Sequence, residues 1–504
     1  MNNQEDHFKN VISHAKEYGF VFQSSEIYDG LSAVYDYGQN GTELKKNIRE
    51  YWWKAMVQMN SNIVGLDAAI FMHPTTWKAS GHVDAFNDPL IDNKDSKKRY
   101  RADVLVEDYC AKIEQKIEKE VNKAEKRFGD AFDKQEFLST NERVLGYQRT
   151  IDSSLKRMAK SLENEDLADV KALIEELEIA DPLSGSRNWT DVKQFNLMFG
   201  TKLGASADTA MELYLRPETA QGIFVNFENV QRTMRAKLPF GIANIGKSFR
   251  NEITPGQFIF RTREFEQMEI EYFCKKENEN EWFDFWVNKR LEWYKGIGIP
   301  EEKLRLREHE ENELAHYASK TVDIEFDYPW GWGELEGIAN RGSFDLSSHE
   351  SSSGKDLSYF DSETNEKIAP VVIEPAGGLT RTLFALLCST YDEEIINDTT
   401  RTLFRFNFEI APVQIGILPL SKKEELIKVS NDIQQTLQKF YRTEVDVTQS
   451  IGKRYRRQDE IGTPYCVTVD FDSLEDLSVT IRNRDSMDQE RIKIEDLLDY
   501  FSKI

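Results

Sequence analysis

The sequence predicts an α+β protein that carries a helical insertion and a separate C-terminal α/β domain. A chain of 504 residues is long enough for roughly two to four domains. Residues 187–273 alternate strand-like stretches with Gly and Pro, whereas residues 106–181 are charged, poor in glycine and helical in their apolar period. From Ala411 onward, strand and helix patterns alternate, which is typical of a compact α/β unit. We therefore expect one domain over residues 1–405, with the insertion at about 106–181, and a second over residues 410–504.

Composition and charge argue against several classes of function. The net charge of −23 argues against indiscriminate binding to nucleic acid, although a local basic patch can still dock the phosphates of RNA. The sequence has no apolar run near 18 residues, and its start, MNNQEDHFKN, lacks the apolar centre of a secretory signal. Its four cysteines are far apart, which argues against a disulfide framework and a tetrahedral zinc site. We expect a cytoplasmic protein that binds neither membrane nor DNA.

Local periodicity predicts the elements in order. Residues 46–59 space their apolar side chains about three to four apart, as in a helix, and residues 63–74 indicate a buried strand that ends at a proline. Residues 249–273, FRNEITPGQFIFRTREFEQMEIEYF, predict two strands joined by a turn at Thr254-Pro255-Gly256. The glycine-rich residues 331–350 are expected to form a loop.

The expected hairpin places cations, a flat ring and carboxylates on one face. Alternate residues of a strand face the same way, so Arg250 and Glu252 would share a face before the turn. The face after the turn would carry Arg261, Arg263, Phe265, Gln267, Glu269 and Glu271. Such a face suits a ligand with phosphates, a planar base and an ammonium group. Taken alone, the first pair could instead form a cross-strand salt bridge, and Phe265 could belong to the core.

A second motif, Gly377-Gly378-Leu379-Thr380-Arg381, is expected to follow a strand and open a helix within residues 371–387. The glycines permit close approach of the backbone to a ligand. Arg381 would lie in the first helical turn, where the helix dipole disfavours a cation, and this favours a functional role such as covering a purine. The segment matches neither the Walker A nor the Rossmann glycine pattern.

Three carboxylates, Glu218, Glu269 and Glu374, lie in or near these segments. Converging on a small cavity, they would bind an ammonium group. They could equally be ordinary surface acids, because Asp and Glu together number 88.

The tail contains a local basic patch in a strongly acidic protein, GKRYRR at residues 452–457. Its cations could dock phosphates while Tyr455 stacks on a base. The same cations could instead form a basic loop that pairs with nearby acids.

The order of these motifs resembles motifs 2 and 3 of the class II aminoacyl-tRNA synthetases. More narrowly, the chain resembles glycyl-tRNA synthetases of the homodimeric type over nearly its full length. The segments that carry the resemblance are FVFQSSEIYDGLSAVYDYG, GLDAAIFMHPTTWKASGHVDAFND, RYRAD, LRPETAQGIFVNF, the hairpin, GWGELEGIANRGSFDLSSH, EPAGGLTR and GKRYRRQDEIGTPYCVTVDFD. The resemblance implies a catalytic domain with an antiparallel sheet flanked by helices, followed by an α/β anticodon-binding domain.

The resemblance also implies roles for individual residues. The catalytic residues would be Arg250, Glu252, Arg261, Phe265 and Arg381. ATP would be bound by Arg250, Asn251, Glu252, Phe260, Arg261, Thr262, Arg263, Glu264, Phe265, Glu334, Leu335, Gly378, Leu379, Thr380 and Arg381. Glycine would be bound by Arg101, Glu218, Phe265, Glu266, Gln267, Met268, Glu269, Glu374, Pro375, Ala376, Gly377 and Gly378. The tRNA would be bound by Lys453, Arg454, Arg456 and Arg457.

The implied reaction is that of a glycine–tRNA ligase, which activates glycine with ATP and transfers it to the 3′ end of tRNA(Gly). Mg²⁺ is expected to accompany ATP, with unassigned ligands, and the chain is expected to form a homodimer. The sequence departs from the family at Ala376, where serine is usual, and at Thr380, where aspartate is usual. Two alternatives stay open: a catalytically silent synthetase-like protein that binds RNA, and a class II ligase for another small amino acid.

Overall fold

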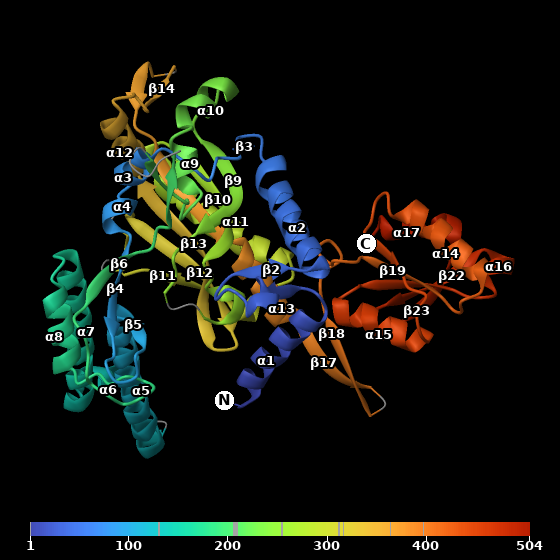
Figure 1. The fold of residues 1–504 in the computed structure, drawn as a ribbon, viewed down its shortest axis with the longest axis horizontal. Helices are drawn as coiled ribbons and strands as arrows, with labels where there is room; N and C mark the ends of the chain where they lie inside the picture. Colours follow the sequence, from blue (N-terminus) through green and yellow to red (C-terminus); the bar gives the residue numbers. More distant parts are fainter. Residues whose placement is uncertain are drawn as a thin grey trace.

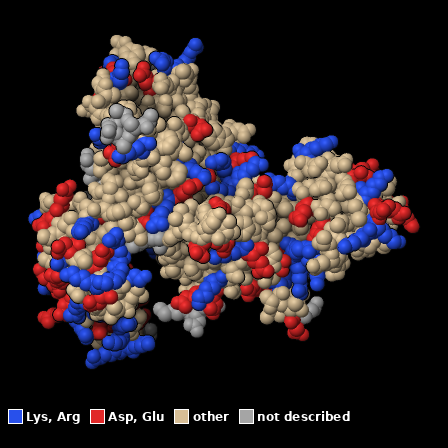
Figure 2. Space-filling view, viewed as in Figure 1, with Lys and Arg blue, Asp and Glu red and all other residues tan. Residues whose placement is uncertain are grey.

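The computed structural model describes residues 2–129, 132–204, 210–253, 256–310, 313–315, 317–362, 364–396 and 398–504. Figure 1 shows a central sheet with helices packed on it, a helical arm at one side and a C-terminal domain at the other. None of the described helices is long and apolar enough to cross a membrane. Figure 2 shows both signs of charge on the visible face, with acidic and basic side chains crowded together on the helical arm.

The centre of the molecule is a seven-stranded sheet in the order β11-β12-β13-β16-β10-β9-β3. Neighbouring strands are antiparallel except β3 and β9, which are parallel. The strands are β11 (Leu304–Glu308), β12 (Lys320–Tyr328), β13 (Gly331–Gly342), β16 (Val371–Gly378), β10 (Glu264–Cys274), β9 (Phe240–Phe249) and β3 (Ile63–Gly65). This sheet, together with its helices, confirms the predicted α+β class.

Helices cover one face of the sheet: α2 (Gln39–Trp53), which continues as a π-helical turn (Lys54–Gln58), α11 (Glu279–Gly296) and α13 (Leu379–Thr390). Met268, Ile270 and Tyr272 of β10 belong to the buried core on this side. Because side chains alternate along a strand, Phe265 and Gln267 of the same strand face the opposite side. The alternation therefore divides β10 into a core face and a face free for a ligand.

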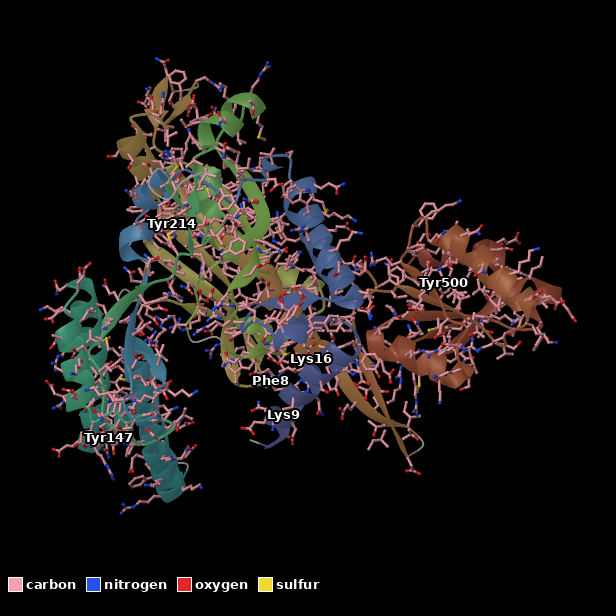
Figure 3. All side chains as sticks on the ribbon, in the orientation of Figure 1. Phe8, Lys9, Lys16, Tyr147, Tyr214 and Tyr500 are labelled. Carbon is pink, nitrogen blue, oxygen red and sulfur yellow. The ribbon has the colours of Figure 1, made fainter. Side chains whose placement is uncertain are left out.

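Helix α1 (Asn2–Glu17) packs against α13. Phe8 lies edge-on to the rings of Trp330 and Phe384, at 5.5 and 6.3 Å between centroids, whereas the neighbouring Lys9 is exposed (Figure 3). The helix thus adds an amphipathic layer over α13.

The opposite face of the sheet is covered at one end by α9 (Ala220–Phe224) and α10 (Phe227–Met234). The ring of Phe227 packs on Phe240 of β9 and Phe273 of β10. Near α9 lie α12 (Phe344–Ser353), α3 (Pro74–Ala79) and α4 (His82–Ala85). Short hairpins β1–β2 (Val21–Gln23, Tyr35–Tyr37), β7–β8 (Gly200–Leu203, Met211–Tyr214) and β14–β15 (Tyr359–Asp361, Glu366–Ile368) complete the domain.

The helical arm confirms the helical character predicted for residues 106–181. It comprises α5 (Ala102–Phe128), α6 (Lys134–Thr140), α7 (Glu142–Glu163) and α8 (Leu167–Glu176), beside strands β4 (Asn87–Asp92), β5 (Arg99–Arg101) and β6 (Lys193–Asn196). Its helices pack through their own core, which includes Val106, Ile151 and Val170. Side-chain oxygens of Asp133, Asn141 and Asp166 cap α6, α7 and α8 by accepting backbone N–H groups.

The C-terminal region confirms the alternating pattern predicted from Ala411. Its sheet runs β20-β19-β21-β22-β23, with β19 parallel to both neighbours. The elements are β19 (Ile415–Pro419), α14 (Glu424–Leu437), β20 (Thr443–Val445), α15 (Ile451–Ile461), β21 (Tyr465–Val469), α16 (Ser473–Asp476), β22 (Ser478–Asn483), β23 (Gln489–Lys493) and α17 (Leu497–Phe501). A separate apolar core, including Ile417, Leu426 and Val467, lies between sheet and helices.

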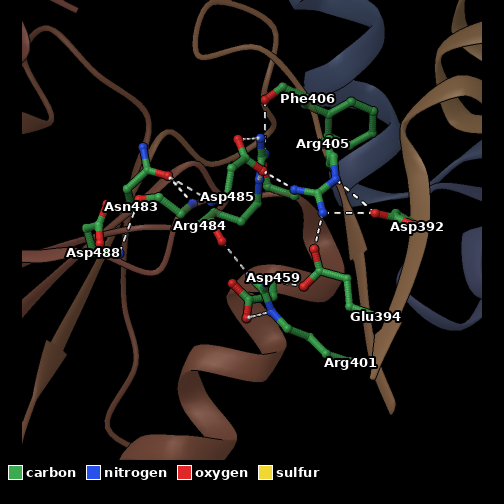
Figure 4. A network of polar contacts seen from close by, with 12 residues as sticks. Asp392, Glu394, Arg401, Arg405, Phe406, Asp459, Asn483, Arg484, Asp485 and Asp488 are labelled. Carbon is green, nitrogen blue, oxygen red and sulfur yellow. Dashed lines mark hydrogen bonds and ion pairs between the residues drawn. The ribbon is translucent and has the colours of Figure 1, made fainter. Parts of the chain in front are cut away.

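A network of arginines and acids joins this region to the hairpin β17–β18 (Tyr391–Ile396, Thr399–Phe404), as Figure 4 shows. Arg401 of β18 donates to Asp459 of α15 at 2.9 Å and to the Arg484 carbonyl at 2.7 Å. Arg482 donates to the same Asp459 at 3.0 Å. Arg401, Asp459 and Arg482 are all buried, so the network fixes the hairpin against α15 without solvent between them.

The structure corrects three predictions. The strand expected over residues 63–74 spans only Ile63–Gly65, and Pro74 begins α3, where its fixed φ is favourable. The expected loop at residues 331–350 is instead strand β13 followed by α12. The residues of 250–263 that the structure describes lie outside any strand, and they include a 3₁₀ turn (Phe258–Phe260).

The third correction has a physical cause in long-range backbone bonds. The N–H of Asn251 donates to the Leu197 carbonyl at 2.7 Å, and that of Arg263 to the Ala33 carbonyl at 2.8 Å. After one further ladder bond, from the Arg250 N–H to the Arg263 carbonyl at 3.0 Å, these contacts replace the ladder of a hairpin. Arg250 and Glu252 therefore share no strand face, and neither do Arg261 and Arg263. Two residues of the predicted turn, Thr254 and Pro255, lie outside the described part of the chain.

Candidate active site

A cleft of about 400 Å³ opens on the face of the sheet opposite α11 and α13. Strands β10, β13 and β16, the start of α13, Arg250, Glu252, residues 259–262 and the start of the helical arm form its walls. Its lining consists of Phe86, Asn87, Asp88, Arg101, Leu197, Arg250, Glu252, Ile259, Phe260, Arg261, Thr262, Phe265, Glu266, Gln267, Glu334, Leu335, Ala376, Gly378, Thr380 and Arg381. The structure therefore brings together most of the residues predicted to bind ATP and about half of those predicted to bind glycine.

Arg250 is held over aromatic rings in this cleft. Its guanidinium carbon lies 5.2 Å from the centre of the Phe265 ring and 5.4 Å from that of Phe86. Its Nε donates to the Pro217 carbonyl at 3.2 Å. One nitrogen is thereby fixed by the backbone, and the cation keeps donors for a phosphate or carboxylate.

Arg381 lies at the start of α13, as predicted, and the structure explains a cation there. Its guanidinium donates to the carbonyls of Phe260 (3.3 Å) and Glu334 (3.0 Å) and pairs with the Glu334 carboxylate at 3.0 Å. It also lies over the Phe260 ring at 4.5 Å. The Arg381 charge lowers the pKa of Glu334. The Glu334 carboxylate and the two backbone carbonyls thus offset the unfavourable helix dipole.

The helical arm supplies one wall of the cleft, a contribution that the motifs did not predict beyond Arg101. Arg101 pairs with Asp88 at 3.3 Å and with Asp103 at 2.5 Å. Burial raises the pKa of Asp88 to about 6, although Arg101 opposes that shift. Across the cleft, Arg261 lies 3.9 Å from the Glu252 carboxylate. Phe86, Asp88 and Leu197 flank the arm where it joins the rest of the chain. This position in the sequence is the feature that could have indicated that they line the cleft.

Beside the cleft floor, farther along the same face of β10 and β16, lies a buried cluster of carboxyl groups that includes the three predicted acids. Glu374 accepts from Arg341 at 2.9 Å, and Arg341 also binds both oxygens of Asp345, at 2.7 and 2.8 Å. Glu218 lies 3.3 Å from the His82 ring nitrogen. Glu269 accepts from Gln267 at 2.7 Å and from the Thr219 hydroxyl. The interpretation of these acids as surface residues is therefore wrong.

Burial and mutual repulsion separate the pKa values of these acids. Burial, reinforced by the charges of Glu374 and Glu218, raises the pKa of Glu269 to about 8. Burial also raises the pKa of Glu374 to about 7, against the opposing effect of Arg341. For Glu218, burial raises the pKa but is outweighed, because His82 and then Arg341 lower it. The cluster thus contains both anionic and proton-bearing groups at neutral pH.

Comparisons with known proteins agree with this arrangement. Family models match residues 88–197 (glycyl-tRNA synthetase insertion domain 1), 202–390 (tRNA synthetase class II core domain for G, H, P, S and T) and 414–504 (anticodon binding domain). Glycine–tRNA ligases of Macrococcus caseolyticus and Staphylococcus haemolyticus are 49% and 50% identical over 494 residues. The matches cover 98% and 97% of this chain, and 97% and 96% of those proteins. The chain belongs to the glycine–tRNA ligase family.

A solved structure supports the same fold. Prolyl-tRNA synthetase from Cryptosporidium parvum, complexed with L-proline and AMP, superposes with a TM-score of 0.58 at 14% identity. The match covers 98% of this chain and 76% of that one. At this identity the likeness shows the fold alone, which is that of a class II synthetase.

The two residues at which the sequence is expected to depart from the family pattern, Ala376 and Thr380, both line the cleft. Ala376 lies in its lining and pairs in register with Glu269 of β10. Thr380 is buried, and its hydroxyl accepts the backbone N–H of Glu266 at 3.2 Å. Thr380 thereby connects the start of α13 to β10. An aspartate at this buried position could accept the same N–H, but only at the energetic cost of a buried charge.

Several predicted residues are not part of the cleft lining. Met268 and Leu379 belong to the apolar core, and Pro375 and Gly377 are buried in β16. Arg263 donates to the carbonyls of Ser32 (2.8 Å) and Glu252 (3.1 Å), and Glu264 pairs with Lys247. Asn251 contributes its backbone N–H to Leu197, as described above. These residues support the cleft, and any contact with a ligand stays a prediction.

The predicted basic patch lies on α15 rather than in a loop. Lys453 and Arg456 are exposed, but Arg454 is buried and donates to carbonyls including that of Asp446 at 3.1 Å. Arg457 pairs with the Asp446 carboxylate and donates to the Thr448 carbonyl at 2.8 Å. The helix therefore divides the four cations into an exposed pair and a pair that holds the local structure.

Proposed function

We propose that this protein is a glycine–tRNA ligase, which joins glycine to tRNA(Gly) at the expense of ATP. One observation carries the proposal: the cleft presents guanidinium groups and an aromatic ring, and buried carboxyl groups lie directly beside its floor. Phosphates and a carboxylate suit the first part, and an ammonium group suits the second. The chain is 49% and 50% identical in sequence to two proteins named glycine–tRNA ligase, which supports the same assignment.

In the first step, a carboxylate oxygen of glycine attacks the α-phosphorus of ATP. The bond from that phosphorus to the bridging oxygen breaks, which leaves glycyl-adenylate and pyrophosphate. Arg250, Arg261 and Arg381 would offset the charge on the phosphates and carboxylate, and Phe265 would stack on the adenine. No general base is needed, because the nucleophile is already an anion, so positioning and charge stabilisation supply the acceleration.

Selection of glycine would take place at the floor of the cleft. Gln267 and Ala376 form its floor, and Glu269 and Glu374 lie just beyond them on the same strands. The ammonium group would face these acids and Glu218, and contact with the floor would exclude amino acids that carry a side chain. Exclusion of one extra methyl by shape alone is worth about 1–3 kcal/mol.

Mg²⁺ would neutralise charge on the phosphates of bound ATP. Within the described residues, no group of three or more His, Cys, Asp or Glu side chains is placed to hold a metal by itself. Glu252 and Glu334 lie in the cleft lining and would fit a cation held chiefly by phosphate oxygens.

In the second step, the 3′-terminal ribose hydroxyl of tRNA(Gly) attacks the glycyl carbonyl and releases AMP. Docking of the tRNA would use the exposed Lys453 and Arg456 of α15, with the C-terminal region reading the anticodon. A homodimer and a cytoplasmic location are proposed from the family resemblance. Both proposals concern assembly and location and leave the chemistry of the cleft unchanged.

The test is charging of tRNA(Gly) transcript with labelled glycine in the presence of ATP and Mg²⁺. We expect acid-precipitable label only when tRNA(Gly), glycine and ATP are all present. Periodate-oxidised tRNA(Gly), which lacks the terminal diol, is the matched control and should accept none. Label that fails to accumulate on intact tRNA(Gly) would contradict the proposed function.

A further inference from the structure

The carboxyl cluster contains two acids outside the predicted glycine-binding set, Asp345, which is bound by Arg341, and Glu271. Glu271 of β10 has a fully buried side chain, and neither of its carboxyl oxygens has a hydrogen-bond partner among the described residues. The register between β10 and β16 pairs Tyr272 with Ile373 and Glu269 with Ala376, which sets Glu271 opposite Glu374. Two anions directly opposite each other on neighbouring strands destabilise a sheet. Burial raises the pKa of Glu271 well above its ordinary value, in agreement with a neutral acid.

The cluster as a whole holds more carboxyl groups than cations. Its acids come from four elements: Glu218 before α9, Glu269 and Glu271 on β10, Asp345 on α12 and Glu374 on β16. The other titratable or charged groups that face it are Arg341 of β13, Arg216 near Glu218, His82 of α4, Tyr317 and His349 of α12. Arg341 is already bound to Asp345 and Glu374, so it cannot neutralise all five acids.

The cluster is connected directly to the cleft floor. Gln267 of the floor donates to Glu269 at 2.7 Å, and its own Oε1 is buried without a partner among the described residues. Ala376 of the floor is the register partner of Glu269. An ammonium group bound at the floor therefore lies next to acids that would otherwise repel one another.

We propose that glycine binding releases a proton from this cluster, because the incoming ammonium group takes over the neutralising role of that proton. The inference rests on the proposed function. The protonated carboxyl group of Glu269 or Glu374 becomes a carboxylate, the ammonium keeps its three hydrogens, and the proton passes to solvent. Glu271 stays protonated throughout and serves as the neutral neighbour of Glu374.

The sign of the pH dependence follows. Acids whose pKa is raised hold a proton before binding, and a cation placed beside them lowers that pKa. The affinity for the ammonium group then rises with pH. It levels off above the pH at which the cluster has already lost this proton before glycine binds. We expect the KM for glycine to fall between pH 6 and pH 8. The fall should reach about tenfold per pH unit over the range in which binding releases one whole proton.

The direct measurement is calorimetric titration of the full chain with 5′-O-(N-glycylsulfamoyl)adenosine at pH 7 in buffers of different ionisation enthalpy. The slope of binding enthalpy against buffer enthalpy counts the protons released. The matched probe is the N-acetylsulfamoyl analogue, in which hydrogen replaces the amino group. We expect release of about one proton with the glycyl probe and about none with the acetyl probe.

Two variants assign the proton. Glu269→Gln should reduce the release and bring the affinity for the glycyl probe close to that for the acetyl probe. Glu271→Gln replaces a neutral acid by a neutral amide of the same shape, so release and affinity should stay within about twofold of the parent chain. Loss of release in Glu271→Gln, with release intact in Glu269→Gln, would overturn the assignment.

Other outcomes separate this inference from the proposed function. Tight binding of the glycyl probe with no buffer dependence would overturn the proton exchange. An affinity that falls in step with KCl but not with choline chloride would show that a metal cation, rather than a proton, is displaced. Failure of both probes to bind would contradict the proposed function itself.

Discussion

The guanidinium of Arg250 lies over the ring of Phe265, with 5.2 Å between its central carbon and the ring centre. The two residues thus form one surface, on which a cation and an aromatic face adjoin. In the proposed reaction the cation meets the α-phosphate and the carboxylate, and the ring meets adenine. Both residues were predicted from the motif, but their mutual contact was not.

Replacing Arg250 by alanine should lower kcat/KM for adenylate formation by about 10²–10³-fold, because the variant lacks a fixed donor at the reacting phosphate. Arg250→Lys keeps the charge without the planar fork and should recover only part of the rate. ATP–pyrophosphate exchange measures the rates, and circular dichroism checks that both variants fold. Near-normal exchange in Arg250→Ala would refute the assigned role.

The hairpin illustrates what could be predicted from sequence. Motif spacing located Arg250, Phe265 and the neighbouring acids in one site, and the alternation of β10 was right from Phe265 to Glu271. The strand limits were wrong, because residues 250–263 bond to Leu197 and Ala33, which are distant in sequence. Local propensity does not contain such long-range partners.

Restoring the family serine tests the departure at the cleft floor. Ala376→Ser adds a hydroxyl beside Glu269 and should lower the KM for glycine by about two- to tenfold, the worth of one hydrogen bond, with little change in kcat. Ala376→Val adds volume without a donor and should raise the KM. An unchanged KM in the serine variant would show that the floor does not contact glycine.

The buried acid at the domain junction supports a prediction about coupling. Asp459 accepts from Arg401 and Arg482, so Asp459→Asn weakens the contact between α15 and the β17–β18 hairpin. Losing one partner of a buried ionic network costs about 3–5 kcal/mol. We expect slower tRNA charging with unchanged ATP–pyrophosphate exchange, and a lower Tm. Equal loss of both activities would instead indicate general misfolding. The milder Glu394→Gln variant, which weakens the same network, can separate misfolding from a loss of coupling.

The exposed face of α15 should bind phosphate. Reversal of Lys453 and Arg456 to glutamate should weaken tRNA binding and reduce the slope of log Kd against log salt by about 0.7–0.9 for each phosphate that the variant no longer neutralises. Arg454→Met is the matched control. Because Arg454 is buried against backbone carbonyls, this variant should lower Tm rather than the salt slope. An unaltered salt slope in the double reversal would contradict this binding surface.

Other parts of the site were beyond the reach of sequence patterns. Arg341 and Asp345 complete the acid cluster, yet their segment was expected to be a loop because of its glycines. In the structure those glycines lie within β13, between two strands, where sheet pairing overrides local propensity. The basic run of α15 likewise gave no sign that Arg454 points inward, since burial depends on the packing of the whole domain.

Amino-acid-dependent ATP–pyrophosphate exchange with the purified chain is the most decisive test of the proposed glycine activation. Glycine, alanine and serine would be compared at equal concentrations with ATP and Mg²⁺. We expect exchange with glycine and rates at least about tenfold lower with alanine and serine, which is the discrimination that one excluded methyl provides. Exchange driven equally by alanine or serine would indicate a ligase for another small amino acid. A folded chain that binds tRNA but shows no exchange at all would contradict the account and indicate a catalytically silent RNA-binding relative.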